Sequence, residues 1–91
     1  MAGFVGEYSV QVKPSARKEL EALPDRVLVR VIQELESLSV TPRPAGCKKL
    51  KGGDREWRIR IGDYRAVYTI DDAKSLVEVT RIRHRSAVYE R

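Results

Sequence analysis

Apolar residues recur at every second position in the segments 8–12 and 57–61, as expected for half-buried β-strands. Two further strands, each following a short turn, are expected over residues 64–70 and 76–82. In the segment 57–61 the apolar side chains point one way, whereas Arg58 and Arg60 point the other way. The alternation predicts a sheet with one face against a core and one basic face.

Two other segments repeat apolar residues every three or four positions, which indicates helices with one buried side. We expect a helix over residues 15–23, with Ser15 as its N-cap, and a second helix over 26–38, capped by Asp25. Pro24 separates them because proline cannot extend a helix. The expected core-facing positions are Ala16, Leu20, Leu23, Leu28, Val31, Ile32, Leu35 and Leu38.

The element order β-α-α-β-β-β predicts an α+β fold. The last three strands are linked by short turns, Gly62-Asp63 being the first, and should form an antiparallel sheet. The two helices are expected to form an antiparallel hairpin covering one face of it, with the N-terminal strand at an edge or beside a central strand. With 91 residues, 42% of them hydrophobic, the chain has material for one core, so we expect a single domain over 1–91.

Charge is distributed unevenly along the chain, whose formal net charge is +5. Up to Gly46 there are 6 Lys and Arg against 6 Asp and Glu, and beyond it 12 against 7. This asymmetry suggests a polyanionic partner that contacts one side of the molecule, the alternative being a sheet surface charged only for solubility. Arginine outnumbers lysine 12 to 6, which favours phosphate recognition because a guanidinium can hold two phosphate oxygens.

Several classes of protein are disfavoured. One cysteine, Cys47, and one histidine, His84, exclude a disulfide within the chain and leave too few ligands for a structural zinc site. We therefore expect no metal, no cofactor and no disulfide-linked partner. No segment approaches the ~18 consecutive apolar residues of a membrane span, and residues 1–7 do not resemble a signal peptide. The expected location is the cytoplasm, without membrane contact.

Short motifs in the second half of the chain resemble a known family. They are Lys-Leu at 49–50 with Gly52, the basic segment 57–61, Gly-Asp-Tyr-Arg-Ala-Val-Tyr at 62–68 and Arg-Ile-Arg-His-Arg-Ser-Ala-Val-Tyr at 81–89. Together with the helical hairpin, they resemble the RelE/ParE toxin superfamily, specifically the RelE branch of bacterial type II toxin-antitoxin systems. The resemblance implies a microbial-RNase-like fold that cuts messenger RNA in the ribosomal A site and is held inactive by a RelB-like antitoxin.

The same resemblance implies roles for individual residues. Arg65 matches the family arginine that grips the scissile phosphate, Arg83 the one that neutralises or protonates the leaving oxygen, and Tyr89 the tyrosine that activates or stacks on the nucleotide. Arg58 and Arg60 stand where relatives have two phosphate-binding lysines; with a pKa above about 12, arginine keeps the electrostatic role but is a poor base. Further RNA or phosphate contacts are assigned to Lys49, Lys51, Arg81 and Arg85.

Metal-free RNA cleavage needs attack by the ribose 2′-OH on phosphorus, with cations stabilising the phosphorane. Since the chain offers only His84 as a near-neutral acid or base, we expect a poor free-standing nuclease that depends on the ribosome. Two other functions stay open: ParE-like inhibition of DNA gyrase without nuclease activity, and ribosome binding that blocks translation without cleavage.

Structural roles are the alternatives for single residues. Arg65 could form a surface ion pair beside Asp63, and Tyr89 could pack the end of the chain. Lys48, Lys49 and Lys51 could belong to a solvated loop. Tyr64 and Tyr68 share one strand face and are assigned to the core, and His84 is assigned a minor RNA contact or none.

Overall fold

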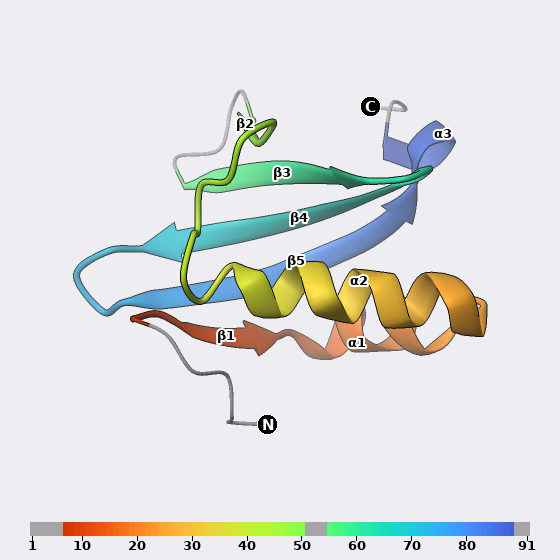
Figure 1. Cartoon of the computed structure of the whole chain (residues 1–91), viewed down its shortest axis with the longest axis horizontal. Helices are drawn as coiled ribbons and strands as arrows, with labels where there is room; N and C mark the ends of the chain where they lie inside the picture. Colours follow the sequence, from red (N-terminus) through yellow and green to blue (C-terminus); the bar gives the residue numbers. More distant parts are fainter. Residues whose placement is uncertain (1–6, 51–54, 89–91) are drawn as a thin grey trace.

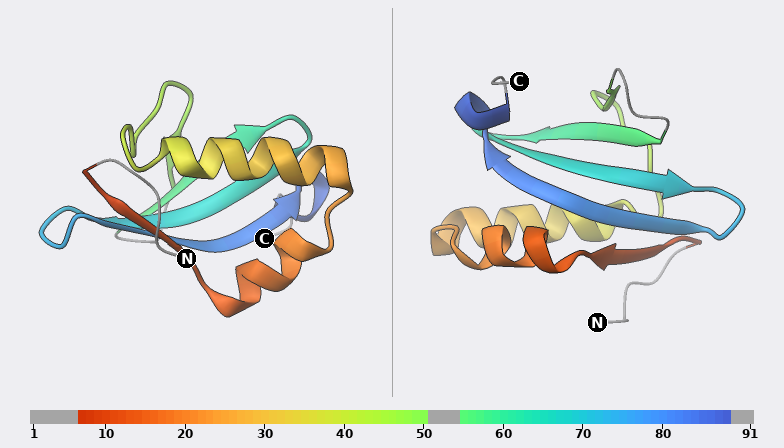
Figure 2. Two further views of the ribbon diagram at one scale, coloured as in Figure 1. Left: turned by 60° about the horizontal axis from the view of Figure 1, so that its bottom comes forward. Right: turned by 180° about the vertical axis from the view of Figure 1, so that it is seen from behind.

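The computed structural model describes residues 7–50 and 55–88. Its elements follow the order β1 (Ser9–Val12), α1 (Pro14–Glu21), α2 (Asp25–Ser37), β2 (Lys48–Lys49), β3 (Glu56–Ile61), β4 (Tyr64–Asp71), β5 (Leu76–His84) and α3 (Arg85–Val88). The strands form one sheet in the order β1-β5-β4-β3-β2, and α1 and α2 lie on the same side of it (Figures 1 and 2). The predicted α+β fold is confirmed, with β2 and α3 as elements that the sequence pattern missed.

The central strands β3, β4 and β5 are antiparallel neighbours, as predicted. The N-terminal strand β1 lies at an edge and pairs with β5 in parallel, from Ser9 opposite Leu76 to Val12 opposite Val79. The whole sheet is therefore mixed. The predicted inward face of β1 is confirmed, because Val10 is buried while Ser9 is exposed.

Helix α1 continues along the edge of β5 where β1 ends. The Lys13 N–H donates to the Val79 carbonyl at 2.9 Å, and the Ser15 hydroxyl donates to the Thr80 carbonyl at 3.5 Å. These bonds partner a strand edge that would otherwise be open beyond β1. The described part of the chain contains no helix that is long and apolar enough to cross a membrane.

Neither helix begins with the side-chain cap that the sequence suggested. Helix α1 begins at Pro14, whose fixed φ suits the first turn, and Ser15 lies inside the helix with its hydroxyl bonded to β5. The N-cap of α2 is Pro24, and Asp25 is the first helical residue. The capping predictions were therefore wrong: the N-cap of α1 is Lys13, two positions before Ser15, and that of α2 lies one position before Asp25.

The buried side of α2 is narrower than predicted. Val31, Leu35 and Leu38 are buried, and Val27, four residues before Val31, packs against the core with them. Ile32 is 36% exposed, so its assignment to the core was wrong. Because each residue turns the helix by about 100°, Ile32 falls at the margin of a stripe centred on the other positions.

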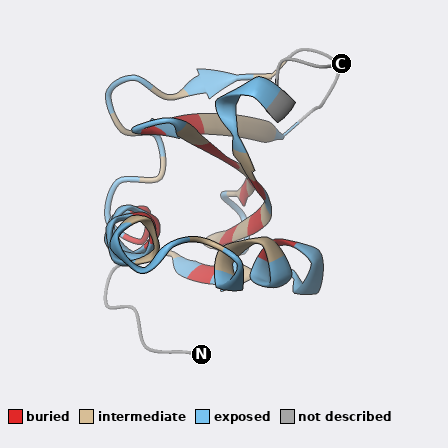
Figure 3. Ribbon diagram, turned by 90° about the vertical axis from the view of Figure 1, so that its right-hand side faces the viewer, coloured by how far each residue is buried: buried red, intermediate tan, exposed pale blue. Residues whose placement is uncertain are grey.

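The core lies between the sheet and the two helices (Figure 3). Tyr68 is its largest fully buried side chain, as the sequence predicted, and its hydroxyl donates to the Pro42 carbonyl at 2.9 Å. Burial raises the pKa of Tyr68, which keeps the phenol protonated. The core also contains Val10, Ala16, Val31, Leu35, Leu38, Ile59, Ile61, Ala66, Ile70, Val77, Val79 and Ile82.

A β-bulge in β5 decides which side chains of its second half face the core. The register between β4 and β5 shifts between Val67 and Tyr68, so Thr80 is an extra residue in β5. Without it, strict alternation would turn Arg81 inward and Ile82 outward. Instead Ile82 is buried at 3% and the Arg81 side chain is 50% exposed. The bulge thus directs the arginines of β5 to the sheet face opposite the helices.

Candidate nucleic-acid interface

Three arginines from adjacent strands stand in one line across the sheet face opposite the helices. Arg60 of β3 lies opposite Arg65 of β4, and Arg65 lies opposite Arg83 of β5. Side chains in such positions are close neighbours, with Cβ atoms roughly 5 Å apart, and like charges there destabilise the sheet. We call Arg60, Arg65 and Arg83 the arginine row. A sheet that concentrates like charge in this way is suited to an anion that lies across it.

A second line of residues runs parallel to the arginine row, two positions along each strand. Lys48 lies opposite Arg58, Arg58 opposite Val67, and Val67 opposite Arg81. Since strand side chains alternate between faces, this line projects from the same face as the row. The two lines form a basic face made of Lys48, Arg58, Arg60, Arg65, Arg81 and Arg83.

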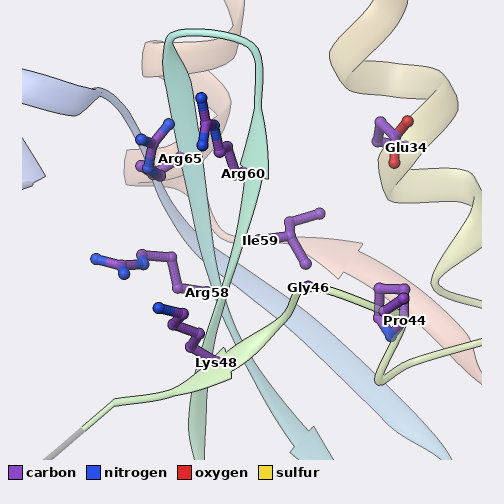
Figure 4. Close-up of a pocket in the computed structure, with 9 residues that line it drawn as sticks. Glu34, Pro44, Gly46, Lys48, Arg58, Ile59, Arg60 and Arg65 are labelled. Carbon is purple, nitrogen blue, oxygen red and sulfur yellow. The ribbon is translucent and has the colours of Figure 1, made fainter.

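A hollow of about 330 Å³ opens at β3, beside the basic face. In Figure 4, Lys48, Arg58, Arg60 and Arg65 project on one side of β3, whereas Ile59 and Glu34 lie on the other side. The hollow therefore wraps around the strand, and its cationic wall is separated from the Glu34 carboxylate. Its lining is completed by Pro44, Ala45 and Gly46 from the segment before β2.

Arg65 is the one buried member of the basic face, with 5% of the residue exposed. Its Nη1 donates to the Tyr64 carbonyl at 2.9 Å and to the Gly62 carbonyl at 3.2 Å. Gly62 has a φ of +61°, a conformation that favours glycine and forms the tight turn between β3 and β4. Within 7–50 and 55–88, no carboxylate lies within 4.0 Å of this guanidinium. The turn therefore fixes the position of Arg65 without neutralising its charge.

Arg83, in contrast, contacts a carboxylate from helix α1. Its Nε donates to Glu19 Oε2 at 2.8 Å, and Arg81 Nη1 lies 3.9 Å from the same oxygen. The other oxygen, Oε1, accepts the Ile82 N–H at 2.7 Å. Sequence reasoning missed Glu19, because residues more than sixty positions apart are joined here only by the fold.

The C-terminal end of the site is tied to the turn between β3 and β4. The Arg85 N–H donates to the Asp63 carbonyl at 2.7 Å, and the Arg85 side chain is exposed at the start of α3. The ring of His84 meets Tyr64 edge-on, with 5.4 Å between the centroids, and its Nδ1 lies 3.1 Å from Ser86 Oγ. His84 is therefore directed away from the arginine row.

The remaining predicted site residues are placed differently. Lys49 lies opposite Trp57, on the other side of the sheet from Lys48. The lysine that shares a face with the arginines is thus Lys48. The alternation of side chains along β2 is the signal that could have distinguished Lys48 from Lys49. Lys51 and Tyr89 lie outside the described residues.

Comparison with known families agrees with this arrangement. Residues 10–89 match the family model described as the ParE toxin of type II toxin-antitoxin systems. The chain therefore belongs to this toxin family. Within it, the chain is 33% identical over 85 residues to the toxin RelG of Mycobacterium tuberculosis, an alignment that covers 92% of this chain and 98% of RelG. The protein is a RelE-like toxin of a type II toxin-antitoxin system.

Solved structures show the same fold. The archaeal RelE-RelB complex from Pyrococcus horikoshii superposes with a TM-score of 0.78 at 25% identity, over 87% of this chain and 96% of that one. The intact RelBE toxin-antitoxin complex of E. coli gives a TM-score of 0.74 at 28% identity, over 85% and 95% of the two chains. Both of these structures are complexes of a toxin with its antitoxin.

Proposed function

We propose that this toxin is an endoribonuclease that cleaves messenger RNA in the ribosomal A site, with the ribose 2′-OH as nucleophile and without a metal. The observation that carries the proposal is the arginine row, Arg60-Arg65-Arg83, which lines up cations from three adjacent strands. A fold gains nothing from aligning like charges, whereas a phosphodiester backbone is attracted to them.

In this reaction the O2′–P bond forms and the P–O5′ bond breaks, which leaves a 2′,3′-cyclic phosphate and a free 5′-OH. Arg65, held by its own turn, binds the scissile phosphate and stabilises the extra negative charge of the phosphorane. Arg83 neutralises the charge that develops on the leaving O5′. By analogy with lost oxyanion donors, each guanidinium contributes roughly 2–4 kcal/mol to the transition state.

Proton transfer is the weak part of this site. The pKa of arginine is above about 12 and that of tyrosine about 10, so neither exchanges protons readily near neutral pH. His84 packs against Tyr64, away from the row. In our proposal, Tyr89 activates the nucleotide or stacks on it. The ribosome holds the message in the conformation needed for attack by the 2′-OH. The proposed enzyme is accordingly a poor nuclease on free RNA.

A RelB-like antitoxin is the proposed protein partner. Val29 and Ile32 are one helical turn apart on α2 and are 57% and 36% exposed. Apolar side chains at this spacing offer a contact for an amphipathic antitoxin helix. The net charge of +5 favours an acidic partner.

The test is a purified translation system programmed with one defined message. We expect the toxin to produce cuts, mapped by primer extension, at codon-spaced positions within the translated frame. The same message without ribosomes should stay intact, and it should also stay intact when initiation is blocked. Uncut message in actively translating reactions would contradict the proposal.

Inhibition of DNA gyrase is the second candidate function, because the family model that matches the chain is described as the ParE toxin. A supercoiling assay with purified gyrase distinguishes the two functions: our proposal expects no effect at toxin concentrations that cleave the message. Arrested translation with intact message and active gyrase would instead indicate a ribosome-binding inhibitor.

A further inference from the structure

One carboxylate reaches the arginine row from outside the sheet. Glu19 of α1 binds Ile82 N–H through Oε1 and Arg83 Nε through Oε2, at 2.7 and 2.8 Å. Each oxygen therefore has its own strong partner, and the backbone bond fixes where the second oxygen stands. The contact to Arg81 is longer, at 3.9 Å. This geometry lets Glu19 hold the side chain of Arg83 more firmly than that of Arg81.

We propose that Glu19 is a positioning residue for Arg83, an inference that rests on the proposed nuclease function. An arginine has three nitrogens that can bond to an anion, and Glu19 occupies Nε. The two terminal nitrogens are thereby left as a fork of fixed orientation for a phosphate oxygen or a leaving oxygen. Without the carboxylate, the guanidinium of Arg83 would rotate among its rotamers, because its side chain is 39% exposed.

Glu19 also has a purely structural effect, since it satisfies the Ile82 N–H at the edge of β5. The substitution Glu19→Gln separates the two roles. The amide oxygen of glutamine still accepts the Ile82 N–H, whereas the charge that attracts Arg83 is lost. A merely structural role predicts nearly unchanged cleavage for this variant.

The positioning role predicts that the maximal cleavage rate falls while the apparent affinity of the toxin for programmed ribosomes does not weaken. The maximal cleavage rate on programmed ribosomes should fall roughly tenfold in Glu19→Gln, because misplacing a reacting group carries a large kinetic penalty. The toxin concentration that gives half-maximal rate should stay the same or fall, because the basic face loses a neutralising charge. Glu21→Gln is the matched control on the same helix: Glu21 is exposed and should leave both quantities unchanged.

A double-mutant cycle shows whether Glu19 acts through Arg83. In an Arg83→Ala background, Glu19→Gln should have no further effect on the rate. Additive losses in the double variant, or a wild-type rate for Glu19→Gln, would overturn the inference. Arg83→Lys gives an independent check, because lysine keeps the charge but cannot bond simultaneously through Nε and a terminal fork; a wild-type rate for Arg83→Lys would also overturn it. Absence of cleavage by the wild-type toxin is a different outcome and refutes the proposed function itself.

Discussion

Arginines at the two ends of the β3-β4-β5 sheet differ in their ion-pair partners. At the turn between β4 and β5, each arginine has its own aspartate: Arg43 pairs with Asp72 at 2.9 Å and Arg55 with Asp71 at 3.3 Å. At the turn between β3 and β4, the arginine row has a single carboxylate, Glu19, within the part of the chain that the structure describes. One end is electrically balanced, and the other is left with excess positive charge.

The balanced end forms a local network that joins distant segments. The Arg43 guanidinium lies 5.2 Å from the centroid of the Trp57 ring, and the Tyr8 hydroxyl donates to Asp72 at 2.6 Å. These contacts connect the residue before β1, the segment before β2 and the turn after β4. Arginine at this end stabilises the fold, whereas the excess charge at the other end is available to an external polyanion. The difference identifies which arginines to test for function.

The largest expected effect separates two single arginines, one from each end. Arg65→Ala should lower message cleavage by about 100-fold or more, because it removes the buried donor assigned to the scissile phosphate. It should also lower the free energy of unfolding by about 2 kcal/mol through the loss of two charged hydrogen bonds. Cleavage by purified protein in the translation system, with circular dichroism melting in parallel, measures both.

Arg43→Ala is the matched control for this experiment. It removes an arginine from the balanced end, so cleavage should stay within about twofold of wild type while the melting temperature falls. Equal losses of cleavage in Arg43→Ala and Arg65→Ala would mean that the two ends do not differ in function.

Much of this contrast could be predicted from the sequence. Alternation along 57–61 identified the basic face, and the motif at 62–68 pointed to Arg65. Both signals are local, because the two-residue period of a strand decides which face of the sheet each side chain points to. The meander followed from the short turns between strands. The predicted roles of these residues in catalysis stay predictions.

The features that could not be predicted depend on contacts between distant segments. Glu19 reaches Arg83 only because α1 follows the edge of β5, and nothing in the helix sequence marks that path. The bulge at Thr80 left a weak trace in the sequence. The apolar positions 77, 79 and 82, all buried in the structure, break the two-residue period of a strand. The caps at Ser15 and Asp25 were misjudged because each helix starts earlier than predicted, with Pro14 as the first helical residue of α1 and Pro24 as the N-cap of α2.

A smaller effect is expected on the salt dependence of nucleic-acid binding when one arginine is replaced at either end of the sheet. Arg60→Gln should reduce the slope of log affinity against log salt concentration by about 0.7, the value for one phosphate contact on a single strand. The probe is a single-stranded 2′-deoxy oligonucleotide, which binds the basic face but cannot be cut. Arg55→Gln, which removes the partner of Asp71, should leave the slope unchanged. Identical slopes for both variants would mean that the basic face does not hold the backbone of the nucleic acid.

The smallest expected effect is a pH dependence of stability confined to the balanced end. Hydrogen bonds from Arg43, and then from Tyr8, hold the pKa of Asp72 below its usual value. A carboxyl group whose folded pKa is depressed stabilises the protein fully above the unfolded value of about 3.9, and this contribution is lost as the pH falls through the folded pKa. Asp72→Asn should therefore melt below wild type at pH 7, and the two melting curves should converge at acidic pH, where the carboxyl group of the folded protein becomes protonated. For Arg60→Gln the difference from wild type should stay constant over the same range, because no described carboxylate lies within 4.0 Å of Arg60. An Asp72→Asn difference that persists at low pH would place the stabilisation in contacts other than the ion pair, and the contrast between the two ends would then not be electrostatic.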